Sequence, residues 1–173
     1  EQWNARLQGL FVEDKISLSA KFAWSKNSVP FLEKNKLKYK PITKGKSWGK
    51  EWDSAWFCLN GHIKKEWRGK KIIADLDFSG EGLVYDPKGR EIQGITNASI
   101  WDQNFARTRV LVPKTCIKNN EVEIWVETAA NSLFGIFVDV DPEQDNPKRH
   151  GTFDAKVETI DLGIFREDIW HLY

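Results

Sequence analysis

Short stretches in which apolar and polar residues alternate most constrain the fold of this chain of 173 residues. From residue 72 to 78 every second residue is apolar, and Asp75 and Asp77 lie between them. From 121 to 128 valine and isoleucine alternate with three glutamates and Trp125. Because neighbouring side chains of a strand point to opposite faces, each stretch predicts a strand with one buried and one solvated face.

A hairpin and further strands surround these two stretches. Residues 83–85 and 91–95 flank Asp86-Pro87-Lys88-Gly89, in which proline and glycine favour a tight turn. Other runs typical of strands cover 53–59, 107–112, 136–140 and 156–163. Short strands separated by turns, with no helical pattern between them, predict a mostly β, antiparallel sandwich or barrel.

The two ends of the chain differ from this β body. Residues 1–45 carry Leu7 and Leu10 near helical spacing and then an irregular segment with prolines. We therefore expect a helical and extended arm there, followed by a β-sandwich domain over 46–163. From 164 to 173 apolar residues recur at helical spacing, which predicts the start of a helix.

Composition excludes several classes of partner. Hydrophobic residues make up 40% of the chain, which is enough for a core without disulfides or metals. Cys58 and Cys116 stand far apart in apolar surroundings and are expected to be buried free thiols. The 26 basic and 25 acidic residues leave a net charge of +1. This balance argues against nucleic acid and against an anionic membrane surface as partners.

Tryptophan is concentrated between residues 45 and 70. Trp48, Trp52, Trp56 and Trp67 all lie in this window, which is bounded by glycines. Large aromatic side chains dominate the packing of small domains, so most of them are expected in the core. The alternative is a contact surface on which a sugar ring stacks.

A search for catalytic and metal-binding constellations finds none in the sequence. The three glutamates between 121 and 128 lie at strand spacing on a solvated face, which is typical of a solvated charge row and not of a catalytic acid and base. His62, His150 and His171 have no ligand spacing to one another or to the cysteines. We therefore predict no catalytic residue, no metal ligand and no cofactor in this chain.

Four sequence motifs occur in an order that points to a known family. They are W-G-x-x-W-x-x-x-W-F with E-W-R-G-K from 48 to 70, G-E-G-L-V-Y from 80 to 85, I-Q-G-I-T from 92 to 96, and V-E-T-A-A-N-S-L-F-G from 126 to 135. In this order they resemble the region that precedes the catalytic domain in glycoside hydrolase family 38 alpha-mannosidases of the cytosolic and bacterial type. The resemblance runs from about residue 24 to the last residue.

The resemblance implies a jelly-roll-like β-sandwich and a place in a longer enzyme. That family hydrolyses terminal alpha-mannosides with zinc, through a covalent intermediate and with retention at the sugar carbon. Its zinc ligands and nucleophile lie in a following catalytic domain, and none of those motifs occurs here. The resemblance therefore implies a noncatalytic N-terminal domain that is inactive alone, a cytoplasmic location, and a helix from residue 164 that leads into the missing catalytic domain.

The preferred interpretation is a structural domain that packs against its own catalytic domain. Such a domain, taken alone, leaves an aromatic and apolar patch exposed, because an interface separated from its partner shows its former core. Trp3, Phe31, Trp170 and Tyr173 are the candidate members of this patch. A contact between copies of the chain in a homo-oligomer is a further possible use of it.

The alternative interpretation is a carbohydrate-binding module. Such a module presents aromatic rings as a platform for the faces of pyranose sugars, with polar neighbours for the hydroxyl groups. Trp101 and Trp125 are the candidates, because Trp101 lies in a polar loop and Trp125 lies on the solvated face of a strand.

Overall fold

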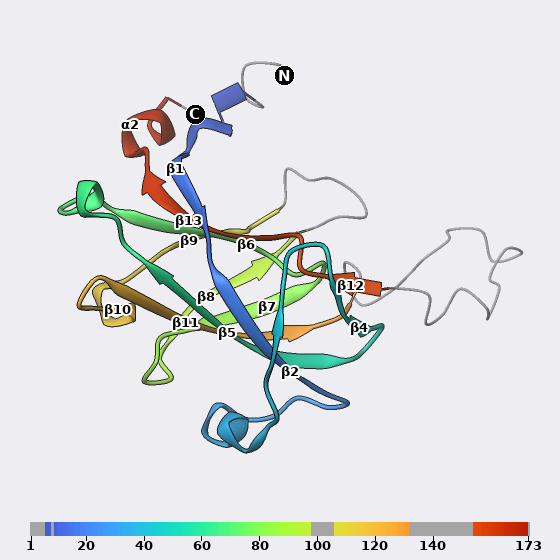
Figure 1. The fold of residues 1–173 in the computed structure, drawn as a ribbon. Coiled ribbons are helices and arrows are strands. Elements are labelled where there is room, and N and C mark those ends of the chain that lie inside the picture. Colours follow the sequence, from blue (N-terminus) through green and yellow to red (C-terminus); the bar gives the residue numbers. More distant parts are fainter. Residues whose placement is uncertain (1–5, 8, 98–105, 132–153, 173) are drawn as a thin grey trace, which may run out of the picture.

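The computed structural model places two antiparallel sheets face to face (Figure 1). It describes the chain except for residues 1–5, 8, 98–105, 132–153 and 173. The four-stranded sheet has the order β1-β13-β6-β9, and the seven-stranded sheet has the order β3-β2-β5-β11-β7-β8, with β10 paired to β11. A small third sheet joins β4 and β12. The prediction of a mostly β, antiparallel sandwich is confirmed.

Each strand belongs to one of the three sheets. In the four-stranded sheet they are β1 (Val12–Ser17), β13 (Thr159–Phe165), β6 (Ile72–Asp77) and β9 (Arg109–Leu111). In the seven-stranded sheet they are β3 (Lys40–Ile42), β2 (Ser19–Ser25), β5 (Ser54–His62), β11 (Glu121–Ala129), β7 (Glu81–Tyr85), β8 (Glu91–Thr96) and β10 (Ile117–Lys118). In the third sheet they are β4 (Ser47–Lys50) and β12 (Asp154–Lys156).

The helical elements are short and connect or end the strands. They are the 3-10 helices η1 (Phe31–Lys36), η2 (Lys65–Trp67) and η4 (Lys114–Cys116), and the α-helix α2 (Glu167–Trp170). Near the start of the chain, Leu7 and Leu10 also have helical backbone. Short helical segments therefore lie near both ends of the chain, as predicted.

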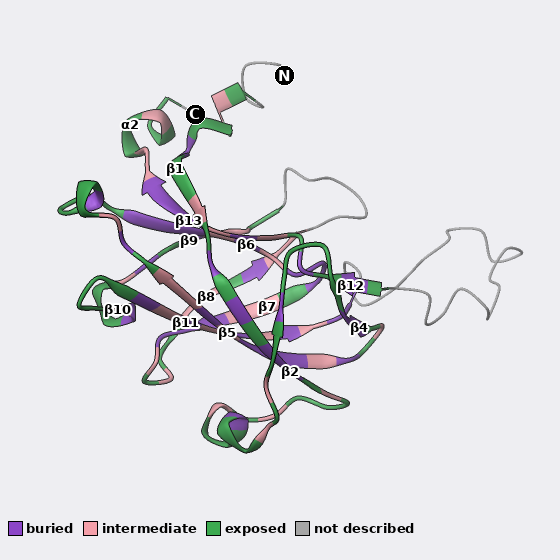
Figure 2. Ribbon diagram, viewed as in Figure 1, coloured by how far each residue is buried: buried purple, intermediate pink, exposed green. Residues whose placement is uncertain are grey.

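Alternation along the strands decides which residues form the core between the sheets. In β11, Val122, Ile124 and Val126 are buried in this core, whereas the glutamates of the same strand are more exposed (Figure 2). Burial of apolar surface stabilises the fold by about 25 cal/mol per Å², so this pattern fixes the register of the strand. The predicted inward and outward faces of this strand are confirmed.

The tryptophan-rich window supplies much of this core. Trp48 and Trp67 are buried there, and the indole Nε1 of Trp48 donates a hydrogen bond to the carbonyl oxygen of Phe78 at 2.9 Å. Trp56 is also buried, but it points to the other face of β5. Trp52 is exposed. The expectation that most of the four are buried is confirmed, and the exception lies in a turn.

The predicted hairpin is confirmed as β7 and β8. Its turn is held by the buried carboxylate of Asp86, which accepts hydrogen bonds from the backbone N–H groups of Lys88 and Arg90 at 2.9 and 3.0 Å. Gly89 has a φ of 86°, a left-handed conformation that favours glycine. The residue types of this turn therefore specify its geometry.

The prediction of an arm over residues 1–45 is wrong for its middle part. The chain runs through β1, makes a corner at the buried Leu18 and continues as β2, so one extended segment belongs to both sheets. The backbone N–H of Leu18 donates to the carbonyl oxygen of Ile160 at 2.8 Å at this corner. The alternation of β2 is broken because Ala23 is buried on the outer face opposite Trp56.

Other sequence-based expectations have mixed outcomes. Cys58 and Cys116 both carry free thiols, but Cys58 is only partly buried. Strand β13 returns the chain to the four-stranded sheet, as expected for 156–163. The strand expected over 136–140 lies outside the described residues.

Candidate functional site

The outer face of the four-stranded sheet carries apolar side chains outside the main core. Along β6, Ile72 and Ala74 point into the sandwich, so Ile73 between them points outward. Ile73 nevertheless is buried, and it forms a second hydrophobic cluster with Phe11 and Val12. We call this outer surface, with its cluster, the A face.

Both ends of the chain contribute to the A face. Leu7 from the start of the chain, and Phe165 and Ile169 from its end, pack against the second cluster. The ring of Trp170 lies 5.1 Å from that of Phe11 and 6.1 Å from that of Phe165, measured between centroids. Segments more than 150 residues apart in sequence therefore meet on one sheet face, close to where both ends leave the sandwich (Figure 1).

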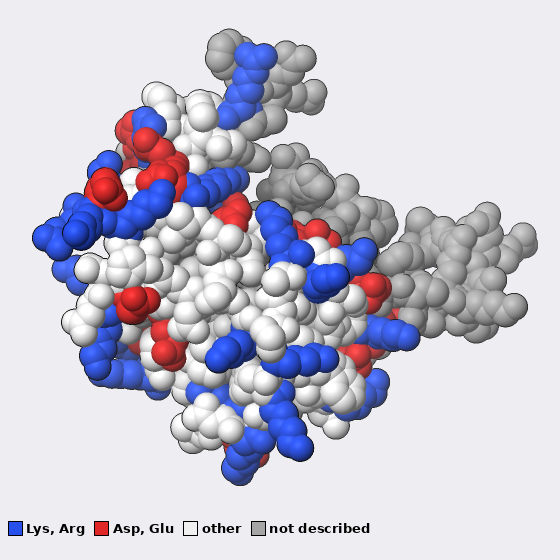
Figure 3. All heavy atoms as spheres, viewed as in Figure 1, with Lys and Arg blue, Asp and Glu red and all other residues white. Residues whose placement is uncertain are grey.

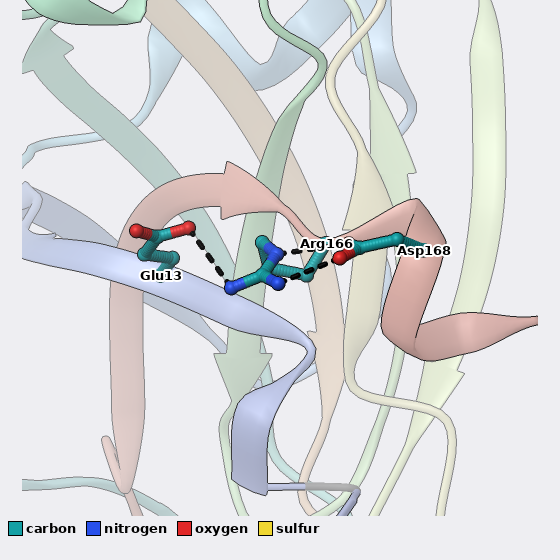
Figure 4. A network of polar contacts seen from close by, with 3 residues as sticks. All are labelled: Glu13, Arg166 and Asp168. Atoms are coloured by element: carbon teal, nitrogen blue, oxygen red, sulfur yellow. Dashed lines mark hydrogen bonds and ion pairs between the residues drawn. The ribbon is translucent and has the colours of Figure 1, made fainter. Parts of the chain in front are cut away.

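Arg166 fastens the end of β13 to both α2 and β1 (Figure 4). Its Nε and Nη2 donate to the carboxylate of Asp168 at 2.8 and 2.6 Å, and its Nη1 lies 3.4 Å from Oε2 of Glu13. Its backbone N–H donates to the carbonyl oxygen of Phe11 at 2.9 Å. A planar guanidinium that binds a carboxylate through two parallel bonds fixes orientation, so α2 starts in a defined direction.

The contacts of this network shift the pKa values of Arg166 and Asp168 in opposite directions. Hydrogen bonds from Arg166 lower the pKa of the Asp168 carboxyl to about 2, and the same contact with Asp168 raises the pKa of Arg166. The groups are exposed to solvent, so their mutual attraction adds little to stability. The network therefore orients the start of α2 and contributes little to the stability of the fold.

A hollow of about 510 Å³ lies on the A face beside α2. It is lined by Ile73, Ile92, Gln93, Arg109, Leu111, Phe165, Glu167, Trp170 and His171. Leu111 and Trp170 expose 50% and 49% of their surface, although both are large and hydrophobic. The guanidinium of Arg109 lies 5.0 Å from the ring centroid of Phe11, which places a cation at the border of the apolar area. The site offers apolar surface with a polar rim.

Charge is not gathered on this part of the molecule. On the view of Figure 3, acidic and basic side chains are interspersed around α2, while mainly basic side chains cover the end with η1 and β3. Mixed charge around an apolar centre is typical of a protein contact surface.

The opposite surface, the outer face of the seven-stranded sheet, is covered by the chain itself. Phe31 of η1 lies 5.7 Å from the ring of Trp56 and 5.4 Å from that of Tyr85. The Nε1 of Trp56 donates to the carbonyl oxygen of Val29 at 2.7 Å. Residues 26–39 thus cover this surface, which we call the B face.

Trp125, predicted as part of a sugar platform, also lies on the B face. Its ring meets Tyr39 edge to face at 5.7 Å, and the ammonium of Lys34 lies 4.1 Å from its centroid. Its Nε1 donates to Glu123 at 2.7 Å. Part of this ring is therefore used in contacts within the chain.

The other predicted site residues have different locations. Trp170 lies on the A face, whereas Phe31 packs on the B face against Trp56 and Tyr85. Trp3, Trp101 and Tyr173 lie outside the described residues. Four members of the A face that the sequence interpretation did not select are Phe11, Ile73, Arg109 and Leu111. The apolar pair Ile72-Ile73, which departs from strict alternation, was the available signal for a strand buried on both faces.

In the part of the chain that the structure describes, no three His, Cys, Asp or Glu side chains converge so that they could hold a metal ion. Within the same part, no helix is long and apolar enough to cross a bilayer.

Comparison with known proteins identifies sequence relatives of one kind. The family model for the jelly roll domain of alpha-mannosidase matches residues 14–156. Alpha-mannosidase 2C1 of Homo sapiens is 27% identical over 108 residues, which cover 62% of this chain and 10% of that protein. Alpha-mannosidase G of Dictyostelium discoideum is 27% identical over 123 residues, which cover 70% of this chain and 10% of that protein. The chain spans about a tenth of the curated relatives it matches.

Solved structures share the fold at lower identity. A beta-glucuronidase from an uncultured Clostridium sp. matches with a TM-score of 0.54 and 10% identity over 89% of this chain and 29% of that chain. Beta-glucuronidase 2 of Bacteroides uniformis matches with a TM-score of 0.52 and 12% identity over 86% of this chain and 17% of that chain. At these identities the likeness shows the fold alone.

Proposed function

Since this chain belongs to the family of alpha-mannosidase jelly roll domains, we propose that it is a noncatalytic N-terminal domain that packs its A face against the catalytic domain of a longer alpha-mannosidase. The observation that carries the proposal is the second hydrophobic cluster, which lies outside the sandwich core and against which both ends of the chain pack. The longer protein would be a family 38 glycosidase that hydrolyses terminal alpha-mannosides.

The A face has the properties of a contact surface. Leu111 and Trp170 expose about half of their surface around a hollow, and Arg109 and Glu167 stand at its border. Interfaces typically combine an apolar centre with a polar rim, and tryptophan and arginine are enriched at their most important positions. The catalytic domain would cover the exposed side chains of Leu111 and Trp170.

The chain alone should have no mannosidase activity. We infer this because the zinc ligands and the nucleophile implied for the family belong to the catalytic domain. The measurement is release of 4-nitrophenol from 4-nitrophenyl alpha-mannoside by the purified chain. Release above a heat-treated sample would contradict the proposal.

The contact itself is tested in the complete alpha-mannosidase. Trp170→Asp places a carboxylate in the centre of the proposed contact, so limited proteolysis should release the N-terminal domain faster than from the parent protein. Leu32→Asp is the matched control, because Leu32 is 89% exposed on η1, at the covered B face. Equal rates of release for Trp170→Asp and the parent would contradict the proposed contact.

The proposal includes a cytoplasmic location and contact between copies of the protein. Cys58 and Cys116 carry free thiols, which suits the reducing cytoplasm. A second copy of the protein remains a candidate for part of the A face, and neither nucleic acid nor a membrane is proposed as a partner.

A further inference from the structure

A second hollow is lined by residues of β2, of β4 and of β12. Figure 1 shows the paired strands β4 and β12 far from α2. The volume of this hollow is about 410 Å³, within the range typical of small-molecule sites. The hollow is lined by Phe22, Trp24, Lys40, Ser47, Trp48, Gly49, Lys50, Asp53 and Asp154. It therefore combines aromatic rings with side chains that donate and accept hydrogen bonds.

Trp24 forms an exposed wall of this hollow. It lies opposite Ala55 in the pairing of β2 with β5, yet it leaves 50% of its surface in solvent. The Trp24 side chain lies near the Asp53 carboxylate and contributes to its low pKa. An exposed indole next to an ionised carboxylate offers a flat apolar surface for stacking beside a hydrogen-bond acceptor.

Asp53 is the centre of the polar contacts. Its Oδ2 accepts from the backbone N–H of Lys50 at 2.9 Å, and its Oδ1 lies 3.5 Å from Nζ of Lys26. Burial raises the pKa of this carboxyl, but the hydrogen bonds from the Lys50 backbone and Trp24, together with the Lys26 charge, lower it more. Asp53 is therefore an ionised acceptor held in place at the edge of the hollow.

The opposite edge presents both donors and acceptors. Lys50 and Asp154 face each other across the pairing of β4 with β12, and Ser47 donates to the Asp154 carboxylate. Lys40 of β3 is an exposed residue, and its ammonium lies 5.1 Å from the ring centroid of Phe22. Charges of both signs around one aromatic wall suit a neutral ligand rich in hydroxyl groups.

A second exposed tryptophan stands in the turn between two of these residues. Trp52 lies between Lys50 and Asp53, exposes 58% of its surface and has a φ of 68°. Left-handed backbone is unfavourable for a bulky residue, and here it is maintained by hydrogen bonds from Trp52 N to Ala130 O at 2.7 Å and from Asp53 N to Lys50 O at 2.8 Å. Neither the exposure nor the backbone conformation of Trp52 stabilises the fold.

From this geometry we propose that the hollow binds a pyranose residue of a neutral oligosaccharide, with Trp24 as the stacking surface and Asp53 and Lys50 as hydrogen-bonding partners. The apolar C–H face of a pyranose matches an exposed indole ring, and its hydroxyl groups match carboxylate acceptors and ammonium donors. This binding is separate from the packing of the A face and does not depend on it.

The test is a titration of the purified chain with methyl alpha-mannoside, mannobiose and cellobiose, followed by intrinsic tryptophan fluorescence and by calorimetry. We expect saturable binding of at least one probe in the millimolar range, at concentrations up to about 50 mM. Trp24→Ala should weaken it about tenfold or more, whereas Trp170→Ala on the A face should leave it unchanged.

Trp52→Gly is a control at a neighbouring tryptophan that does not line the hollow. Glycine adopts a positive φ without steric cost, so this variant should keep the fold and bind the sugar as the parent chain does. The proposal is overturned if none of the three probes shows saturable binding, or if Trp24→Ala, folded by circular dichroism, binds as the parent does. Either result leaves the packing of the A face untouched.

Discussion

The two outer faces of the sandwich differ in how their aromatic side chains are covered. Each carries aromatic side chains beyond the main core, but residues 26–39 cover the B face, so that Trp56 is only 1% exposed. Among the described residues, the two ends of the chain pack on the A face, and Trp170 remains 49% exposed over Phe11. The difference teaches that one face is completed within the domain, while the other has the character of a surface that a neighbouring domain completes.

The largest expected difference between the faces is in stability. Trp56→Ala removes a buried indole that packs against Phe31 and Tyr85 and donates to Val29, so it should lower the free energy of unfolding by about 3–5 kcal/mol. Trp170→Ala should lower it by less than about half as much in the isolated chain, because half of that side chain is already in solvent. Urea denaturation measures both. Equal losses would remove the distinction between the faces.

Two aspartates with the same low pKa extend the comparison to acid stability. Burial raises the pKa of Asp86 in the β7–β8 turn, but hydrogen bonds, first of all from the Arg90 backbone, outweigh this and hold it at about 2. The pKa of Asp168 beside the A face is also lowered to about 2, by Arg166, but that carboxylate is exposed.

The sign of the pKa shift decides how the free energy of unfolding depends on pH. A carboxyl whose pKa is lower in the folded state stabilises the protein above its unfolded value of about 3.9, and this contribution is lost as the pH falls toward 2. Asp86→Asn should therefore lower the free energy of unfolding by about 2 kcal/mol at pH 7 and by much less near pH 2. Asp168→Asn should show a much smaller dependence on pH, because solvent screens the attraction between Arg166 and this exposed carboxylate. A loss for Asp86→Asn that is constant from pH 7 to pH 2 would contradict this account.

A smaller effect tests how the B face is closed. A β-carbon on Gly89, whose φ is 86°, would lie 2.7 Å from Cδ1 of Phe31, so Gly89→Ala must displace the ring that covers Trp56. Gly45 has a similar φ of 80° and nothing within 4 Å of such a carbon, so Gly45→Ala is a matched control for the backbone strain alone.

We expect both substitutions to lower stability by about 1 kcal/mol through strain, and Gly89→Ala to lower it by about 1 kcal/mol more through the clash. Thermal unfolding of the two variants measures the difference. If they are equally stable, Phe31 adapts freely and the closure of the B face is looser than described.

Sequence patterns predicted the central strands because their alternation reports burial on one face. In β11 this pattern is complete, and the β7–β8 hairpin is specified by its turn residues. The same argument fails for β2, where Ala23 is buried on the outer face by residues 26–39. A strand covered on both sides does not alternate, so residues 12–25 were mistaken for an arm.

The candidate site could be predicted only in part for a related reason. The sequence predicts Trp170 as a member of an exposed interdomain patch, but nothing local to Phe11 or Arg109 reveals that they lie close to it. Their proximity results from the corner at Leu18 and from the sheet order β1-β13-β6-β9, which are long-range features. Phe31 is predicted as a member of the same patch, but its contacts with Trp56 and Tyr85 place it on the B face.

The most direct test of the central claim is oxidative footprinting of the isolated chain and of the complete alpha-mannosidase under the same conditions. We predict that Trp170 and Leu111 react several-fold more slowly in the complete protein, while Leu32 on the B face reacts equally in both. Equal reactivity of Trp170 and Leu111 in the two samples would show that the A face stays in solvent and would contradict its role as a domain contact.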